Sequence, residues 1–279
     1  MTAPLTVAAA LRAATARLAD SESARLDAEL LLADSLGVTR TRLYSRLEFE
    51  LDAASVARFD ALIDARARHT PLAYLIGRAE FWSLDFHVTA DVLVPRPETE
   101  LLVEQALAAW PPHKPGVLID LGTGSGVVAA ALAHERPALT VLASDVCAAA
   151  LIVARGNFNR LGLSRIGCLR APWLTAIAAQ SCDVILSNPP YVGAAEAVDK
   201  AVGFEPSLAV FADDDGAAAL VAIVAEAPRC LKRGGYIALE HGFQQGEMVR
   251  ALLATNGFTR SATHRDLAGH ERVTSAWRD

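Results

Sequence analysis

Apolar residues recur every three or four positions in the first part of the chain, up to about Ile76. This spacing predicts amphipathic helices, each with one buried face. The inward residues are expected to be Leu5, Ala8, Leu11 and Thr15 in a first helix, Leu26, Leu30 and Leu31 in a second, and Val56, Phe59, Leu62 and Ile63 in a helix over residues 52–68. Residues 1–76 are therefore predicted to form a helical domain that either stabilises its neighbour or docks a partner.

Residues 77–116 show a different pattern. Apolar and polar residues alternate over Glu80–Val88, which is also rich in aromatic side chains. Together with the following Asp91–Val94, this segment predicts a β-hairpin. A proline is suited to opening the helix expected over Glu98–Ala109, and the charged residues at its start either cap this helix or line a binding site. Trp110–Gly116 has the Pro and Gly content of a linker. We assign this segment to a β-hairpin and a linker helix.

From Val117 onwards, short apolar strands alternate with helical stretches. The predicted strands are Val117–Asp120, Val141–Asp145, Arg165–Leu169, Asp183–Leu186, Tyr236–Glu240 and Arg272–Trp277. The predicted helices are Val127–His134, Ala148–Leu161, Gly216–Leu231 and Gln244–Asn256. Such alternation predicts an α/β fold with a doubly wound, mostly parallel sheet over residues 117–279, ending in an antiparallel edge.

The stretch Asn188-Pro189-Pro190-Tyr191 follows one of these strands directly. Prolines cannot donate to a sheet, so the strand must end there, and open α/β sheets bind ligands at the carboxyl ends of their strands. The Asn188 side-chain oxygen and the Pro189 carbonyl can accept both hydrogens of one planar NH2 group, on which the Tyr191 ring can stack. The stretch predicts a site for an amide or amino nitrogen. A proline-rich turn with an Asn cap is the simpler alternative.

A second candidate site is the glycine-rich turn Leu121–Gly126. Its glycines are spaced G-x-G-x-G, whereas a dinucleotide fingerprint is G-x-G-x-x-G. Asp120 would repel a pyrophosphate but suits a positively charged amino group. Asp145, about twenty residues beyond the turn, is placed to accept hydrogen bonds from both hydroxyls of a ribose. A ligand with a ribose, an ammonium and a carboxylate but no phosphate is S-adenosylmethionine, and Trp173 either flanks its adenine or belongs to the core.

Composition narrows these possibilities. The 279 residues are 52% hydrophobic and 21% charged, which is typical of a globular protein with an ample core. The net charge of −6 disfavours a broad nucleic-acid interface, which needs clustered Lys and Arg.

The four cysteines form no C-x-x-C pair and the histidines are scattered, so we expect buried free thiols and no metal site. Charges such as Arg12 interrupt the Ala-rich start, so we expect a cytoplasmic protein without a membrane segment.

Asp120–Gly126 followed by Asn188–Tyr191 resembles the class I S-adenosylmethionine-dependent amino-methyltransferases. Further stretches narrow the resemblance to the peptide chain release factor glutamine methyltransferases, the HemK family. These stretches are Phe81–Phe86, Val94–Glu100, Asn159–Leu163, Phe204–Pro206 and Leu239–Gly242. The resemblance covers nearly the whole chain. It implies a Rossmann-like methyltransferase sheet and methylation of the side-chain amide nitrogen of the glutamine in the Gly-Gly-Gln motif of release factors, with S-adenosylhomocysteine as the other product.

The family's functional residues carry over to matching positions of this sequence. The resemblance implies that the cofactor is bound by Asp120, Gly122, Thr123, Gly124, Ser125, Gly126, Asp145, Trp173 and Asn188. It implies that the glutamine is bound by Asn188, Pro189, Pro190 and Tyr191, with catalytic roles for Asn188, Pro189 and Tyr191. The N-terminal helices would contact the release factor, and we expect a monomer. Ala171 departs from the family, which usually has an acid there to bind the adenine amino group.

Two other functions use the same residues. An Asn-Pro-Pro-Tyr site also serves enzymes that methylate an exocyclic amine of adenine or guanine, which reach a flipped base. Those enzymes usually carry a basic surface or a target-recognition domain, and neither is visible in this sequence. The second alternative is a protein that binds S-adenosylmethionine without catalysing a reaction and acts through its N-terminal helices. The intact Asn188–Tyr191 stretch argues against this alternative.

Overall fold

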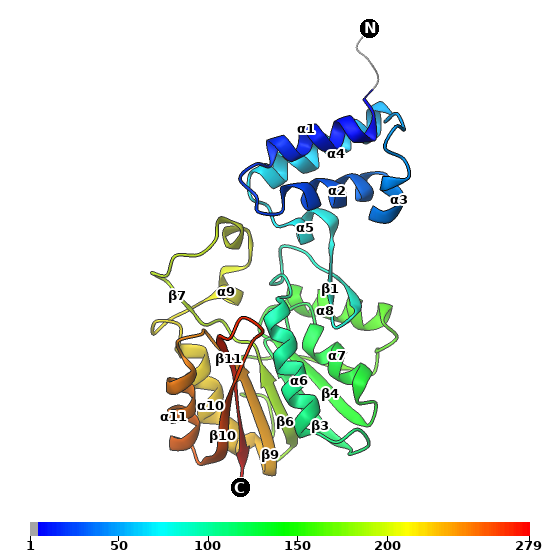
Figure 1. The fold of residues 1–279 in the computed structure, drawn as a ribbon. Helices are drawn as coiled ribbons and strands as arrows, with labels where there is room; N and C mark the ends of the chain where they lie inside the picture. The colour runs from blue at the N-terminus through cyan, green and yellow to red at the C-terminus, as the bar shows by residue number, and fades with distance from the viewer. Residues whose placement is uncertain (1–4) are drawn as a thin grey trace. The chain divides into compact units, whose positions relative to one another are not determined.

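The computed structural model describes residues 5–279, and their contacts divide the chain into two units. One unit extends to Gly77 and includes Asp199–Phe204, and the other comprises Arg78–Val198 and Glu205–Asp279. Each unit contains a hydrophobic core of its own. Figure 1 shows the helices and strands of the two units. Within residues 5–279, no helix has both the length and the apolar character needed to cross a membrane.

The first unit is helical, as predicted. Its helices are α1 (Val7–Arg17), α2 (Ala24–Ser35), α3 (Arg40–Tyr44), α4 (Ala53–Ala67) and α5 (Leu72–Ile76), with the short 3-10 helix η2 (Lys200–Phe204) assigned to the same unit. Side-chain oxygens cap three of them: Thr6 on α1, Thr39 on α3 and Asp52 on α4 each accept a hydrogen bond from a backbone N–H of the first turn. Such caps satisfy donors that a helix start leaves unpaired.

The inward faces of α1 and α2 differ from the prediction. Helix α1 buries Val7, Ala10 and Ala14 beside Leu11, so the predicted face was wrong by about one position. In α2, Leu26 is exposed while Glu29 is buried. The buried acid is tolerated because basic and phenolic side chains pair with it. These are Arg25, Arg40 and Tyr44, at 2.5, 2.7 and 2.6 Å from the Glu29 carboxylate. Apolar periodicity alone cannot foresee such pairing.

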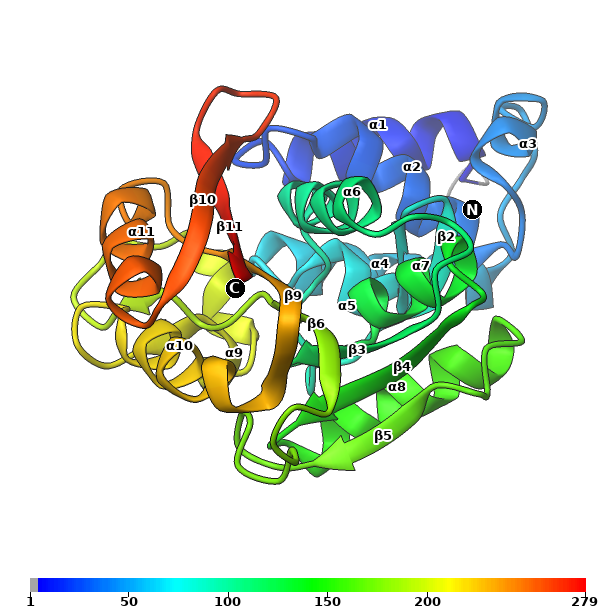
Figure 2. The same cartoon turned by 90° about the horizontal axis from the view of Figure 1, so that it is seen from below.

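The second unit is built on a seven-stranded sheet of order β10-β11-β9-β6-β3-β4-β5 (Figure 2). Its strands are β3 (Gly116–Leu121), β4 (Leu139–Asp145), β5 (Gly167–Arg170), β6 (Cys182–Ser187), β9 (Leu231–Glu240), β10 (Phe258–Arg265) and β11 (Glu271–Arg278). The strands from β9 to β5 pair in parallel, and β11 is antiparallel to both of its neighbours. The predicted fold class, a doubly wound, mostly parallel α/β sheet with an antiparallel edge, is confirmed.

Helices cover both faces of this sheet because alternate strand residues point to opposite sides. The core on one face contains Leu118 and Leu186, and the core on the other contains Ile119 and Ile185. Helices α6 (Glu100–Ala109), α7 (Val127–Glu135) and α8 (Ala148–Arg160) pack on the first face, and α10 (Ala218–Cys230) and α11 (Gly246–Thr255) on the second. The remaining elements of this unit are η1 (Pro97–Thr99), α9 (Ser207–Val210), β7 (Val192–Gly193) and β8 (Phe211–Ala212).

Two strand predictions need correction. The hairpin consists of β1 (Arg78–Phe81) and β2 (Leu84–His87), joined by a two-residue turn in which Trp82 and Ser83 have φ of 54° and 56°. Positive φ at both central positions is the geometry of a tight hairpin turn, so the hairpin closes before Asp91–Val94, and predicting a strand there was wrong. Strand β10 was not predicted, because most of its side chains are exposed and polar.

Candidate active site

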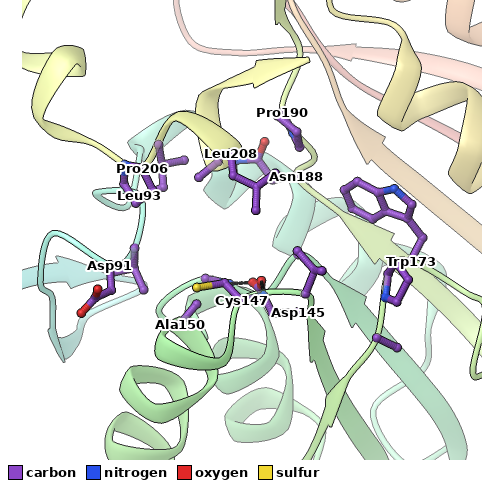
Figure 3. Close-up of a pocket in the computed structure, with 17 residues that line it drawn as sticks. Asp91, Leu93, Asp145, Cys147, Ala150, Trp173, Asn188, Pro190, Pro206 and Leu208 are labelled. Atoms are coloured by element: carbon purple, nitrogen blue, oxygen red, sulfur yellow. Dashed lines mark hydrogen bonds between the residues drawn. The ribbon is translucent and has the colours of Figure 1, made fainter. Parts of the chain in front are cut away.

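The sheet changes its winding direction at β3. The chain passes from β3 to β4 and β5 on one side and then returns to β6 on the other side. The carboxyl ends of β4, β3 and β6 therefore lie next to one another, which is where open α/β sheets bind ligands. A cavity of about 340 Å³ is found here (Figure 3).

Six of the predicted site residues line this cavity: Gly122, Gly124, Asp145, Trp173, Asn188 and Pro190. The others, Asp120, Thr123, Ser125, Gly126, Pro189 and Tyr191, are not among its lining residues. The remaining lining residues come from three places, and only Ala171 among them was expected near the cofactor. They are Asp91, Val92 and Leu93 after the hairpin, Val146, Cys147, Ala150, Ala171 and Pro172 around the ends of β4 and β5, and Pro206, Leu208 and Ala209 at α9.

The glycine-rich turn is held by groups behind it. Gly126 has a φ of +88° and ends the turn at the start of α7. A Cβ at this position would lie 2.5 Å from the Phe158 ring, so only glycine lets α7 approach α8 this closely. Asn157, fully buried in α8, donates to the Ser125 carbonyl at 2.8 Å and to the His87 carbonyl at 2.9 Å. The turn is thereby tied to both α8 and the hairpin.

Asp120 lies behind the turn and is 2% exposed. One carboxylate oxygen accepts hydrogen bonds from the Thr123 hydroxyl at 2.6 Å and the Ala129 N–H at 3.2 Å. Burial raises the pKa of Asp120 to about 6, the Thr123 and Ala129 hydrogen bonds act to lower it, and the nearby charge of Asp145 raises it further. This carboxyl group supports the turn and adds negative potential beneath it.

Asp145 is the last residue of β4 and lines the cavity. Its Oδ2 accepts a hydrogen bond from the Gly124 N–H at 3.0 Å, and its Oδ1 accepts one from the Cys147 N–H at 2.9 Å (Figure 3). Each carboxylate oxygen can accept two hydrogen bonds, so both keep one site for a ligand. The side chain is therefore fixed in position and still able to bind a pair of hydroxyl groups.

The sequence left open whether Trp173 lies at the ligand site or in the core, and its position meets both descriptions. Its side chain packs against the core on the α10 face and also lines the cavity. A Cβ on Gly122 would lie 3.6 Å from Trp173 Cζ3, which places the indole beside the glycine-rich turn. Its φ of +46° is unusual for a bulky residue. At the expected acid position, Ala171 is buried and brings only a methyl group.

Asn188 follows β6 and lines the cavity, with its amide fixed from behind. Its Nδ2 donates a hydrogen bond to the Thr99 hydroxyl oxygen at 3.0 Å. The Tyr191 hydroxyl donates to Glu240 Oε1 at 3.4 Å, and burial raises the pKa of Tyr191, with the charge of Glu240 acting in the same direction. The Tyr191 carbonyl accepts from Gln245 Nε2 at 3.3 Å.

An ion pair between Arg96 and the buried Glu205 joins two of the other stretches that carry the family resemblance. Arg96 donates to both carboxylate oxygens of Glu205, at 2.8 and 2.7 Å, and the Glu205 side chain is 1% exposed. Glu205 directly precedes Pro206 of the cavity lining. A charge-assisted pair with one partner desolvated fixes geometry strongly, so it holds the segment before η1 against this wall of the cavity.

Comparison with known proteins identifies the family. The family described as PrmC N-terminal domain matches residues 9–77, and that described as Methyltransferase small domain matches residues 97–204. The release factor glutamine methyltransferase of Xylella fastidiosa is 43% identical over 268 residues, which are 95% of this chain and 96% of that protein. That of Pseudomonas aeruginosa is 44% identical and covers 92% and 94% of the two chains. The chain belongs to the release factor glutamine methyltransferase family.

Solved structures agree with this family at the level of the fold. The hMettl16 catalytic domain, solved with the MAT2A 3'UTR hairpin 6, has a TM-score of 0.58 at 16% identity and covers 78% of this chain and 81% of its own. A methyltransferase from Pyrococcus furiosus has a TM-score of 0.52 at 18% identity, covering 70% and 89%. No metal-binding group of three or more His, Cys, Asp or Glu is found among residues 5–279.

Proposed function

We propose that this chain transfers a methyl group from S-adenosylmethionine to the side-chain amide nitrogen of the glutamine in the Gly-Gly-Gln motif of peptide chain release factors. One observation carries the proposal: Asn188 lines the cavity while its Nδ2 is engaged by Thr99. Its Oδ1 is then the end available to a substrate NH2 group. Family membership supplies the identity of the substrate.

The cavity suits S-adenosylmethionine in its chemistry. Asp145 offers two spare acceptor sites for ribose hydroxyls, and Trp173 offers an aromatic face for an adenine. None of the residues that line the cavity is basic, which fits a ligand without phosphate. When bound, this cofactor supplies an activated methyl group on a sulfonium. The buried Asp120 adds a favourable negative potential for a cationic ligand.

The contribution of the chain to catalysis is then mainly orientation. The lone pair of an amide nitrogen is delocalised into its carbonyl, so the nitrogen is a poor nucleophile. Asn188 Oδ1 and the Pro189 carbonyl would accept the two amide hydrogens and turn the nitrogen toward the methyl group. Holding reactants in this way contributes several kcal/mol to catalysis, by analogy with oriented intramolecular reactions. No general base is needed beforehand, since the proton can leave to water after transfer.

The deciding experiment is intact-peptide mass spectrometry of a release factor incubated with the chain and S-adenosylmethionine. The Gly-Gly-Gln peptide should gain the mass of one methyl group, and a release factor with Ala in place of that Gln should gain none. A release factor that stays unmodified would contradict the proposal. Salt-sensitive methylation of an adenine or guanine oligonucleotide would instead favour the nucleic-acid alternative. Size-exclusion chromatography would test the expected monomer.

A further inference from the structure

The corner Asn188–Tyr191 has few ways of being held in place. Pro189 and Pro190 have no N–H to donate, so the middle of the corner can be held only by groups that donate to its carbonyls. The same prolines fix their own φ angles and restrict the residue before each of them. Because the corner is stiff, the position of the Pro189 carbonyl depends on how the two ends of the corner are anchored.

Gln245 anchors the Tyr191 end of this corner. It is the residue before α11, and its Nε2 donates a hydrogen bond to the Tyr191 carbonyl at 3.3 Å. Its Oε1 accepts a hydrogen bond from the Gly242 N–H at 2.9 Å. A backbone N–H can only donate and a backbone carbonyl can only accept, so both partners require the same orientation of the Gln245 amide. In that orientation its donor faces the corner.

The turn that carries Gln245 is itself held. The Gly242 carbonyl accepts a hydrogen bond from the Gln245 N–H at 2.9 Å and lies 2.9 Å from His241 Nδ1. His241 is fully buried, and burial lowers the pKa of its ring, which favours the neutral form. Nδ1 then carries the ring hydrogen, because the carbonyl can only accept, and Nε2 accepts from the Thr274 hydroxyl of β11 at 2.8 Å. Gln245 therefore lies on a turn that is fixed to the sheet.

Gly216 packs against the hydrogen bond between Gln245 and Tyr191. A Cβ at Gly216 would lie 2.1 Å from the Tyr191 carbonyl oxygen and 3.1 Å from Gln245 Nε2. Leaving a closely packed carbonyl without a donor costs free energy. We therefore expect the corner to shift when the Gln245 amide is removed.

We propose that Gln245 is a positioning residue for methyl transfer. By holding the Tyr191 carbonyl it holds the stiff corner, and so keeps the Pro189 carbonyl where it can accept a hydrogen of the substrate amide. Thr99, which bonds to the Asn188 amide at 3.0 Å, holds the other end of the corner. The inference rests on the proposed function. It adds that a side chain outside the cavity lining helps to orient the glutamine nitrogen.

Two substitutions separate the contact with Tyr191 from the contact with Gly242. Gln245→Glu keeps an oxygen for the Gly242 N–H but turns its second oxygen toward the Tyr191 carbonyl, which a carboxylate repels. Gln245→Met has a similar length and loses both hydrogen bonds. In single-turnover methylation of a release factor at saturating S-adenosylmethionine, both variants should be slower by about tenfold, as for the loss of one orienting hydrogen bond. Calorimetric affinity for S-adenosylmethionine should be unchanged in both.

The matched control is Gln244→Glu. It adds the same charge one position earlier, on an exposed side chain, and should keep the wild-type rate. An equal loss of rate in Gln244→Glu and Gln245→Glu would assign the effect to charge alone and overturn the proposal.

Other results would also overturn the proposal. If Gln245 only stabilises the turn, Gln245→Glu should react normally and Gln245→Met alone should be slow. A parallel loss of cofactor affinity and rate would make Gln245 a general support of the fold. Thermal unfolding shows whether each variant folds, and if Gln245→Glu does not, a normal rate in Gln245→Met still decides against the proposal. A wild-type chain that methylates no release factor overturns the proposed function and this inference together, whereas normal rates in wild type and both variants overturn only the inference.

Discussion

Two backbone hydrogen bonds fix the Asp145 carboxylate in the position in which it can bind the hydroxyls of a ribose. Because Gly124 and Cys147 donate to its two oxygens, the carboxylate is already oriented before a ribose arrives. Asp145→Ala should weaken S-adenosylmethionine binding by about 1.5–3 kcal/mol, the usual range for charge-assisted hydrogen bonds. Calorimetric titration measures this, with Glu104→Ala, which removes an exposed acid from α6, as the matched control. Unchanged affinity in Asp145→Ala would refute the assignment.

Substitution of Asn188 tests the part of the site proposed to bind the glutamine amide. Asn188→Ala removes one of two proposed amide acceptors but leaves β6 and both prolines in place. The loss should fall on kcat rather than on cofactor affinity, on the order of a hundredfold, because the missing bond orients the reacting nitrogen. Asn188→Asp should do little better, since an added charge beside the sulfonium favours the ground state. Single-turnover rates at saturating cofactor measure this, and Asn159→Ala, on the exposed side of α8, is the control.

A near-normal rate in Asn188→Ala would return this residue to the status of a turn cap. The pair of experiments on Asp145 and Asn188 therefore separates cofactor binding from substrate orientation at two positions of the same cavity.

Sequence reasoning reached these two residues because their signal is local. Asp145 and Asn188 each stand directly after an apolar strand, and the end of such a strand is where a doubly wound sheet binds its ligand. Thr99 is 89 positions from Asn188, and nothing in either local pattern indicates that their side chains meet. The hydrogen bonds of Asp120 were equally hidden, because its role depends on how α7 starts.

At the scale of elements, the segment before α10 approaches the turn after β6 very closely. Gly216 has a φ of +86°, and a Cβ there would lie 2.1 Å from the Tyr191 carbonyl oxygen. Gly216→Ala should therefore displace the Asn188–Tyr191 turn and lower both stability and kcat. Gly257→Ala is the matched control, because Gly257 has a similar φ of +81° but open space around it.

Thermal unfolding and turnover distinguish the two glycine variants. Both should lose about 1–2 kcal/mol of stability from the left-handed backbone. Overpacking should cost Gly216→Ala a further 1–3 kcal/mol or so, and only this variant should lose methyl transfer. Equal behaviour of the two variants would mean that the contact with Tyr191 relaxes freely.

The elements themselves were largely predictable where hydrophobic periodicity is strong. The central parallel strands β3 and β6 are mostly buried, so each contains a continuous apolar run in the sequence. Strand β10 is an edge strand with polar exposed side chains, and its pairing with β11 is interrupted by two register shifts, so its sequence carries little strand signal. The burial of Glu29 in α2 was not predicted for another reason: its hydrogen-bond partners come from α3 as well as from α2.

At the scale of the whole molecule, the division into units predicts a division of labour. Among the described residues 5–279, the cores of the sheet unit contain no residue from the helical unit, so removal of residues up to Ile76 should leave S-adenosylmethionine binding intact. If the helices dock the protein substrate, the truncated chain should show a raised KM for a release factor. Calorimetry and steady-state kinetics measure the two effects. Equal loss of both would mean that the helices only support the fold.

The sheet also fixes the distance between the positions of Asp145 and Asn188. Ser144 of β4 and Ser187 of β6 both pair with Leu121 of β3, and Asp145 and Asn188 are the residues immediately after them. The two side chains therefore start from one row of the sheet, two strand spacings or about 9.5 Å apart. Substitution can change how strongly either group binds, but this interval is a property of the backbone ladder. An enzyme of this architecture can therefore accommodate a longer or shorter methyl acceptor by changing the Asn-Pro-Pro-Tyr corner or the segments that wall the cavity, but not by changing this interval.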